Sequence, residues 1–154
     1  MIKKITKTLA LSFLLIGVFA CGSDSEGPDT EGPSVDITTP NETDTYKRGT
    51  ALPLNAKFTD NKELAKCIIS ISYVTPASSA AQLKGIGTPW TPAENGDTEV
   101  INFTEKKEQT VTISMLFGQE IEAACLSGDY KLKFEMTDAE GNATTEEITI
   151  KIGG

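Results

Sequence analysis

Hydrophobic and polar residues alternate with a period of two along most of the chain after residue 34. Successive side chains of a strand point to opposite faces of a sheet, so this alternation predicts strands with one buried face and one solvated face. We expect about seven short strands, centred on residues 35–37, 52–58, 67–74, 101–103, 111–115, 130–136 and 148–152.

Turn residues separate these segments, and no segment shows the 3.6-residue period of an amphipathic helix. Asp60-Asn61-Lys62 follows the second strand, and Asp138 to Asn142 follows the sixth. Pro53 has no N–H to donate, so the second strand should lie at a sheet edge or begin there. The pattern predicts an all-β fold, an Ig-like antiparallel β-sandwich over residues 35–154.

Several segments resemble known Ig-like modules. Leu126 to Tyr130 (LSGDY) resembles the tyrosine corner of immunoglobulin-like domains. Residues 35–40 (VDITTP) and 54–64 (LNAKFTDNKEL) are similar to an Ig-like lipoprotein family of Bacteroidetes, domain-of-unknown-function family 4625. The likeness covers roughly residues 33–74 and 126–152. The resemblance implies a histidine-rich stretch after the third strand. This chain has no histidine, so no metal role of that stretch carries over.

The first 20 residues have the three parts of an export signal. Lys3, Lys4 and Lys7 are followed by an apolar run from Leu9 to Ala20. A run of about 12 residues is too short to span a bilayer, which needs roughly 20, and is typical of a signal peptide. The alternative, a buried core helix, fits poorly because a Gly/Ser/Asp stretch follows at once.

The signal ends in Val18-Phe19-Ala20-Cys21, which resembles a lipobox. The resemblance implies cleavage before Cys21, diacylglycerol on its sulfur and an acyl chain such as palmitate on the new N-terminus. Two or more acyl chains are enough to anchor a protein stably to a bilayer. The alternative is ordinary secretory cleavage without lipid.

Residues 21–34, rich in Gly, Ser, Pro and acids, are expected to be a flexible tether after the lipidated cysteine. Gly22 to Glu26 (GSDSE) resembles a signal that directs Bacteroidetes lipoproteins to the cell surface. We therefore expect an outer-membrane lipoprotein exposed at the surface, against the alternative of a plain acidic linker.

The charge of the chain limits the classes of partner it can bind, and its cysteines allow two redox states. The formal net charge is −8, and the signal carries three lysines and no acid, so the exported chain is more acidic still. Nucleic acids are excluded as partners, because binding them requires Lys and Arg to replace counterions. Beyond Cys21 there remain Cys67 and Cys125, which form either a disulfide in the oxidising envelope or two buried free thiols.

The absence of histidine removes the commonest general base and metal ligand. We expect no enzyme, a small hydrolase being the least favoured alternative, and no cofactor besides the lipid on Cys21. No metal is assigned, although Asp60, Asn61, Asp138 and Asn142 are weak calcium candidates because their loops share one end of an Ig-like sandwich. The same residue types are also ordinary turn formers.

The 75–98 segment is unusually long for a loop and contains the only tryptophan, Trp90. Trp90 is a candidate ligand contact if it is exposed, or caps one edge of the sandwich if it is not. We expect a non-catalytic binding or adhesion module at the cell envelope, with an unidentified glycan or protein ligand. The alternative is a structural accessory subunit that docks to another envelope protein.

Overall fold

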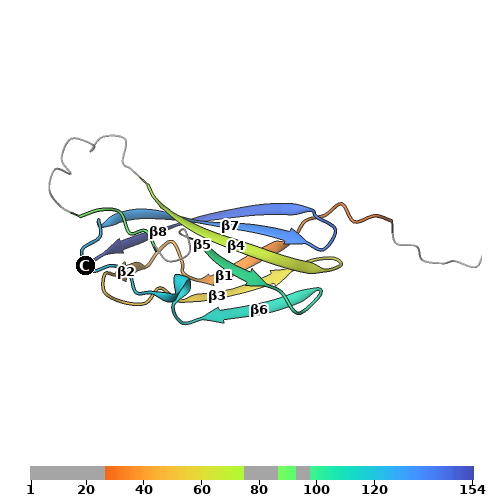
Figure 1. The fold of residues 1–154 in the computed structure, drawn as a ribbon, viewed down its shortest axis with the longest axis horizontal. Helices are drawn as coiled ribbons and strands as arrows, with labels where there is room; N and C mark the ends of the chain where they lie inside the picture. Colours follow the sequence, from red (N-terminus) through yellow and green to blue (C-terminus); the bar gives the residue numbers. More distant parts are fainter. Residues whose placement is uncertain (1–26, 75–86, 93–97) are drawn as a thin grey trace, which may run out of the picture.

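The computed structural model describes residues 27–74, 87–92 and 98–154. Two sheets face each other in this part of the chain (Figure 1). One has the strand order β1-β3-β6 and the other β2-β8-β7-β4-β5. The strands are β1 (Ser34–Thr39), β2 (Thr45–Lys47), β3 (Leu54–Thr59), β4 (Leu64–Tyr73), β5 (Thr98–Asn102), β6 (Glu108–Ile113), β7 (Gly128–Asp138) and β8 (Ala143–Gly153).

The all-β sandwich expected from the sequence is confirmed. The neighbour order β8-β7-β4 in one sheet and β1-β3-β6 in the other is that of an Ig-like sandwich. The seven predicted strands are present, and the described residues hold an eighth, β2. β2 has three residues, too few for a periodic pattern, and it pairs parallel with β8, where we expected antiparallel pairs alone.

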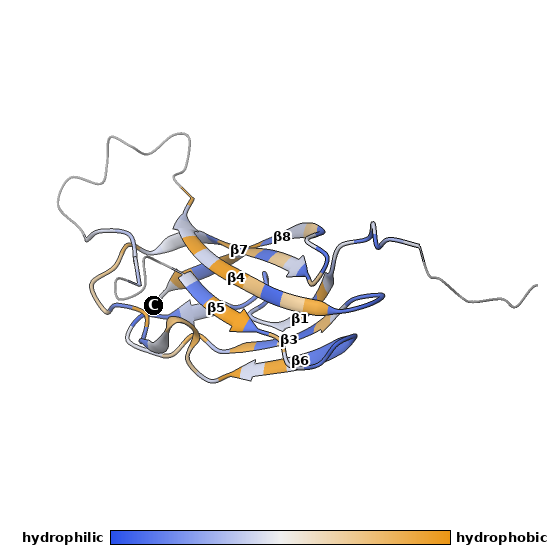
Figure 2. Cartoon of the chain, turned by 45° about the vertical axis from the view of Figure 1, so that its right-hand side comes forward, coloured by the Kyte–Doolittle hydropathy of each residue, from blue (hydrophilic) through white to orange (hydrophobic). Residues whose placement is uncertain are grey.

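The core lies between the two sheets and follows the alternation in the sequence. In β3, Leu54, Ala56 and Phe58 are buried while the residues between them are exposed. In the facing sheet, burial alternates along β4 from Cys67 to Ile71, and Figure 2 shows the apolar positions of this strand. β3 begins directly after Pro53 and is the central strand of its sheet. The prediction that the strand starts at the proline is therefore right, and the edge position is wrong.

A tyrosine corner fixes the start of β7, as the resemblance implied. The Tyr130 hydroxyl donates to the carbonyl oxygen of Leu126 at 2.7 Å and is fully buried. The same hydroxyl accepts a hydrogen bond from the backbone N–H of Trp90 at 3.0 Å. One phenol therefore joins the strand, the loop before it and the segment 87–92.

Different segments of the chain lie at the two ends of the sandwich. Residues 27–33 and the turns after β3 and β7 lie together at the right-hand end in Figure 1. β4 begins there, with Leu64 opposite Asp138, and ends with Tyr73 opposite Tyr130. Ten residues of strand span about 30 Å, which separates the two ends. In the described part of the chain, no helix is both long enough and apolar enough to cross a membrane.

Candidate functional site

Three aspartates from distant parts of the sequence meet at one end of the sandwich. Asp29 precedes β1, Asp60 follows β3, and Asp138 ends β7. One carboxylate oxygen from each lies within 4.8 Å of the others. We call these three residues the aspartate cluster. Asp138 is 3% exposed and Asp29 is 9% exposed, so the cluster is largely closed to bulk solvent.

Two of the carboxylates are held by the turns in which they lie. The Oδ1 of Asp60 accepts hydrogen bonds from the backbone N–H groups of Lys62 and Glu63, at 2.8 and 2.7 Å. The Oδ1 of Asp138 accepts the N–H of Asn142 at 2.7 Å, which closes the β7–β8 hairpin. These are the local side-chain-to-backbone bonds that make aspartate a turn former. Each bond also fixes the direction of the other carboxylate oxygen.

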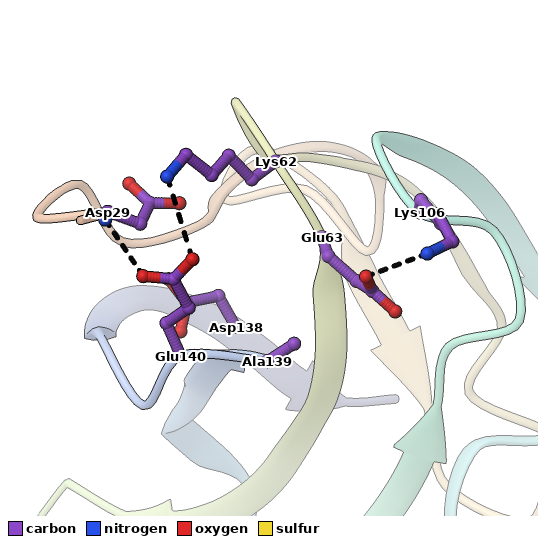
Figure 3. Close-up of a pocket in the computed structure, with 7 residues that line it drawn as sticks. All are labelled: Asp29, Lys62, Glu63, Lys106, Asp138, Ala139 and Glu140. Atoms are coloured by element: carbon purple, nitrogen blue, oxygen red, sulfur yellow. Dashed lines mark hydrogen bonds and ion pairs between the residues drawn. The ribbon is translucent and has the colours of Figure 1, made fainter. Parts of the chain in front are cut away.

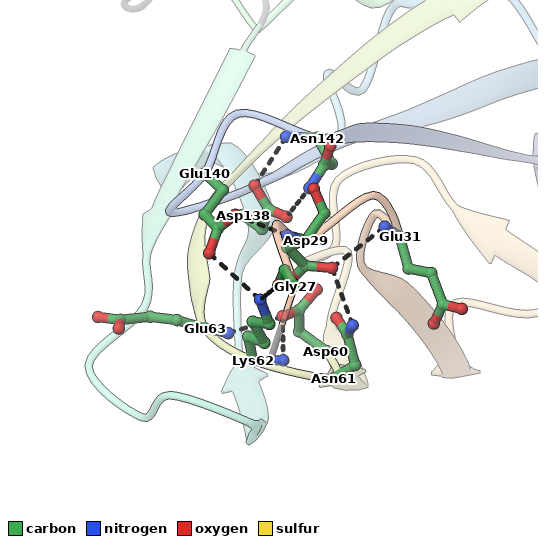
Figure 4. A network of polar contacts seen from close by, with 10 residues as sticks. All are labelled: Gly27, Asp29, Glu31, Asp60, Asn61, Lys62, Glu63, Asp138, Glu140 and Asn142. Carbon is green, nitrogen blue, oxygen red and sulfur yellow. Dashed lines mark hydrogen bonds and ion pairs between the residues drawn. The ribbon is translucent and has the colours of Figure 1, made fainter. Parts of the chain in front are cut away.

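Asp29 is brought to the cluster by contacts with both turns (Figure 4). Its N–H donates to Oε2 of Glu140 at 2.8 Å, and its carbonyl oxygen accepts Nδ2 of Asn142 at 3.2 Å. Its Oδ1 accepts Nδ2 of Asn61 at 2.8 Å and the N–H of Glu31 at 3.2 Å. The chain from residue 27 therefore makes specific contacts with the sandwich.

Two buried oxygens in the cluster have no hydrogen-bond partner within the described residues. They are the Oδ2 atoms of Asp29 and Asp60. The hydrogen bond from Asn61 lowers the pKa of Asp29, assisted by the N–H of Glu31 and the charge of Lys62, while burial acts in the opposite direction. Neighbouring residues cover the Asp29 side chain, but few other atoms surround it at this end of the domain. Burial therefore raises its pKa less than the hydrogen bond from Asn61 lowers it.

A pocket of about 200 Å³ opens beside the cluster (Figure 3). Lys62 donates to the carbonyl oxygen of Gly27 at 2.7 Å and pairs with Glu140 at 3.5 Å. Across the pocket, Lys106 pairs with Glu63 at 2.9 Å. The pocket is lined by Asp29, Lys62, Glu63, Lys106, Asp138, Ala139 and Glu140.

The structure brings together the calcium candidates named from the sequence and assigns them different tasks. Asp60 and Asp138 present carboxylates to one point. Asn61 and Asn142 donate through Nδ2 to Asp29 and Asp138, so their amides orient carboxylates. Asp29 was missed because its surroundings, GPDTEGP, have the composition of a linker. The available signal was the aspartate two residues before Glu31, the spacing of the Asx turn that it forms.

The candidate disulfide between Cys67 and Cys125 is wrong, since both are buried free thiols. Cys67 lies opposite Met136 near the end of β7, whereas Cys125 lies beside the Tyr130 hydroxyl near its start. Six residues of strand separate these levels by about 20 Å, and a disulfide requires Cα atoms within about 7 Å. Burial, with a smaller contribution from the charge of Glu135, raises the pKa of the Cys67 thiol to about 12.

Trp90 is not an exposed ligand contact. Its side chain is 2% exposed and its ring meets that of Phe117 edge-on, with centroids 5.9 Å apart. Phe117 adopts a left-handed conformation with φ of 66° and anchors its N–H on Oε2 of Glu99 at 3.0 Å. The alternative in which the tryptophan caps the sandwich is therefore the correct one. The rest of the candidate binding loop, 75–86 and 93–97, lies outside the described residues, as does Cys21.

The fold and site together define an Ig-like β-sandwich domain with a cluster of buried carboxylates at one end. The family described as a domain of unknown function (DUF4625) matches residues 19–153. The chain belongs to this family. No curated protein matches the sequence.

Among solved structures, the chain is similar to a DUF4466 family protein from Parabacteroides merdae, with 13% identity and a TM-score of 0.46. The match covers 81% of this chain and 46% of the other. This chain therefore spans less than half the length of that relative.

Proposed function

We propose that this protein is a lipid-anchored, non-catalytic binding module of the bacterial cell envelope, held at the outer membrane through Cys21 and exposed at the surface. The lysine-rich start, the short apolar run and the sequence VFAC support export and lipidation. The absence of histidine throughout the chain favours binding over catalysis.

The observation that carries this proposal is the arrangement of the two ends of the sandwich. Residue 27, the start of the described chain, lies at the aspartate-cluster end. The connection from β4 to β5 leaves at the other end, after Tyr73, about 30 Å away along β4. A domain anchored through its N-terminus would therefore turn the described ends of this connection, Tyr73 and Thr98, away from the membrane. Loops held out by a rigid scaffold are where binding residues concentrate.

Two cell experiments test the anchor and the address. In detergent phase partition, the parent chain should enter the detergent phase and Cys21→Ala should not. Proteinase K added to intact cells should degrade the parent, with a periplasmic protein as the intact control. Equal partition of Cys21→Ala would contradict lipidation, and protection until the outer membrane is permeabilised would contradict surface exposure.

The binding role is tested by exchanging ten residues of the connection between β4 and β5. Residues 76–85 are replaced by a Gly/Ser sequence of equal length, and both proteins are applied to a glycan array and to extracellular-matrix proteins. The parent should bind at least one probe and the loop variant should lose that signal at an unchanged melting temperature. Equal signals from the two proteins would contradict a role for this loop.

An outward-facing apolar pair supports the accessory-subunit alternative. Val100 of β5 is 51% exposed and lies opposite half-buried Ile68 of β4, on the solvent face of the five-stranded sheet. Exposed apolar side chains on a sheet face can take part in a protein interface. Val100→Lys should abolish cross-linking of this chain to an envelope partner if that alternative holds, and leave the cross-linking pattern unchanged if it does not.

A further inference from the structure

We propose that Asp29, Asp60 and Asp138 bind a divalent cation of the size of Ca²⁺, which joins residues 27–33 to the two turns at this end of the sandwich. The proposal stands on the described domain and does not depend on how the chain is anchored.

The spacing of the carboxylates is compatible with a single bound ion. Calcium takes oxygen ligands at about 2.3–2.6 Å, so two ligands on opposite sides of the ion lie about 4.8 Å apart. One carboxylate oxygen from each aspartate of the cluster lies within 4.8 Å of the other two. Mg²⁺ needs about 2.1 Å in a strict octahedron. Calcium tolerates irregular coordination and magnesium does not, so calcium is the ion to test first.

The unpaired oxygens give a second, independent observation. Asp29 is 9% exposed, and its Oδ2 is buried with no hydrogen-bond partner. The Oδ2 of Asp60 is in the same state. A buried acceptor without a partner is costly and rare in native proteins, and a bound ion can supply the missing partner. Here two such oxygens belong to the same three-residue group.

The remaining coordination positions have sources nearby. Each oxygen of Asp138 accepts one hydrogen bond from Asn142 and keeps a free lone pair. The adjoining pocket of about 200 Å³ has room for several waters, each of which occupies about 30 Å³. Asn61 and Asn142 hold the carboxylates in direction, as outer partners of metal ligands commonly do.

Lys62 is the competing explanation, because an ammonium group could neutralise the cluster. Within the described chain, its ion pair at 4.0 Å or less is with Glu140 and not with an aspartate of the cluster. Its Nζ also donates to the carbonyl oxygen of Gly27. Lys62 therefore lies beside the cluster and leaves both unpaired oxygens without a partner.

The first measurement is a titration of the purified full chain, stripped of metal with EDTA, with CaCl₂ or MgCl₂. Calcium sites of extracellular modules have Kd values of about 0.1–1 mM. At 10 mM calcium, mass action then predicts a rise in melting temperature of about 5–10 °C. Magnesium at the same concentration should give a clearly smaller rise. An unchanged melting temperature together with no heat of calcium binding would overturn the proposal.

Substitutions locate the ion. Asp29→Asn and Asp60→Asn keep the shape of the side chain and should each weaken calcium binding at least tenfold. Asp36→Asn, on the exposed face of β1, is the matched control and should bind as the parent does. Melting temperatures in EDTA show whether each variant folds. Equal calcium affinity in Asp29→Asn, Asp60→Asn and Asp36→Asn would overturn the assignment.

Lys62→Gln separates an ion site from an internal ion-pair network. If calcium occupies the cluster, removing the neighbouring positive charge should tighten calcium binding severalfold. If Lys62 is instead the intended partner, Lys62→Gln should lower the melting temperature in EDTA without any gain in calcium affinity, which would overturn the proposal.

A protease experiment tests whether the ion joins residues 27–33 to the sandwich. Glu31 is exposed and lies two residues after Asp29, so a glutamate-specific protease should cut there more slowly when the ion fixes the segment. Calcium should slow this cleavage in the parent and not in Asp60→Asn, whose substitution is distant in sequence from the cleaved bond. Equal cleavage rates with calcium and EDTA in the parent would overturn the proposal that the ion fixes residues 27–33. Detergent partition is unaffected by these outcomes, so failure here is distinguishable from failure of the lipid anchor.

Discussion

Replacing Tyr130 by phenylalanine removes one hydroxyl from the structure and leaves the ring in place. That hydroxyl donates to the carbonyl oxygen of Leu126 and accepts from the N–H of Trp90. Both partners lie in a buried region, and the Tyr130 side chain is fully covered. The ring still contacts Tyr73, whose centroid is 5.1 Å away, so apolar packing is unchanged.

The expected loss of stability follows from the two orphaned groups. Leaving a buried donor or acceptor without a partner costs about 1–3 kcal/mol each. Tyr130→Phe should therefore lower the free energy of unfolding by about 2–6 kcal/mol, a large part of the 5–15 kcal/mol typical of a domain. Tyr46→Phe is the matched control. It loses a single hydrogen bond, accepted from the N–H of Asn41 in a contact that is only part-buried, so it should cost about 1 kcal/mol or less.

Urea unfolding followed by the fluorescence of Trp90 measures both variants, since this is the only tryptophan and it is buried. The midpoint should fall in Tyr130→Phe with an unchanged dependence on urea, because the surface exposed on unfolding is the same. A loss no larger than that of Tyr46→Phe would refute the view that this hydroxyl joins three segments.

Three further predictions concern backbone shape, thiol reactivity and the dependence of stability on pH. Gly87→Ala should lower the free energy of unfolding in urea by about 2 kcal/mol or more, because φ is 66° and the new methyl would collide with the carbonyl oxygen of Ala124. The control Gly141→Ala, with φ of 95° and open space around it, should lower it less. Equal losses in the two variants would contradict the collision. Cys67 should resist iodoacetamide at pH 8 until urea is added, because its raised pKa leaves almost no thiolate in the folded chain. The pKa values of Cys67 and Tyr130 both rise to about 12 on folding, from 9.0 and 10.0, so the unfolded chain loses these protons at a lower pH than the folded chain does. The free energy of unfolding should therefore be unaffected below about pH 9 and fall as the pH rises toward 12. Equal free energies of unfolding at pH 8 and pH 11 would contradict this.

The sandwich could be predicted from the sequence because its physics is local. Alternation in segments such as 54–58 and 130–136 records which side chains face the core, and burial follows that alternation residue by residue. The tyrosine corner was readable because its partners are four residues apart. The turns at Asp60 and Asp138 were readable because each aspartate accepts a backbone N–H from within its own turn.

The features that were missed, and the position of Trp90, which the sequence left open, depend on contacts between segments distant in sequence. β2 is held by pairing with β8, about 100 residues later, and leaves no pattern of its own. Trp90 is surrounded by linker-like residues, yet the Tyr130 hydroxyl and the ring of Phe117 hold it in the core. Asp29 is fixed by groups more than 30 residues away. Composition describes a segment alone and carries no information about such partners.

The position of Asp29 predicts that the folded domain begins earlier than the alternation indicates. A chain starting at residue 34 keeps every strand but loses the partners of Asn61, Asn142 and Glu140. It also leaves the carboxylates of the β3–β4 and β7–β8 turns without the segment that covers them. A chain starting at residue 27 should therefore melt at a higher temperature than one starting at residue 34. Equal melting temperatures would mean that residues 27–33 contact the sandwich without stabilising it, and that the tether extends as far as the first strand.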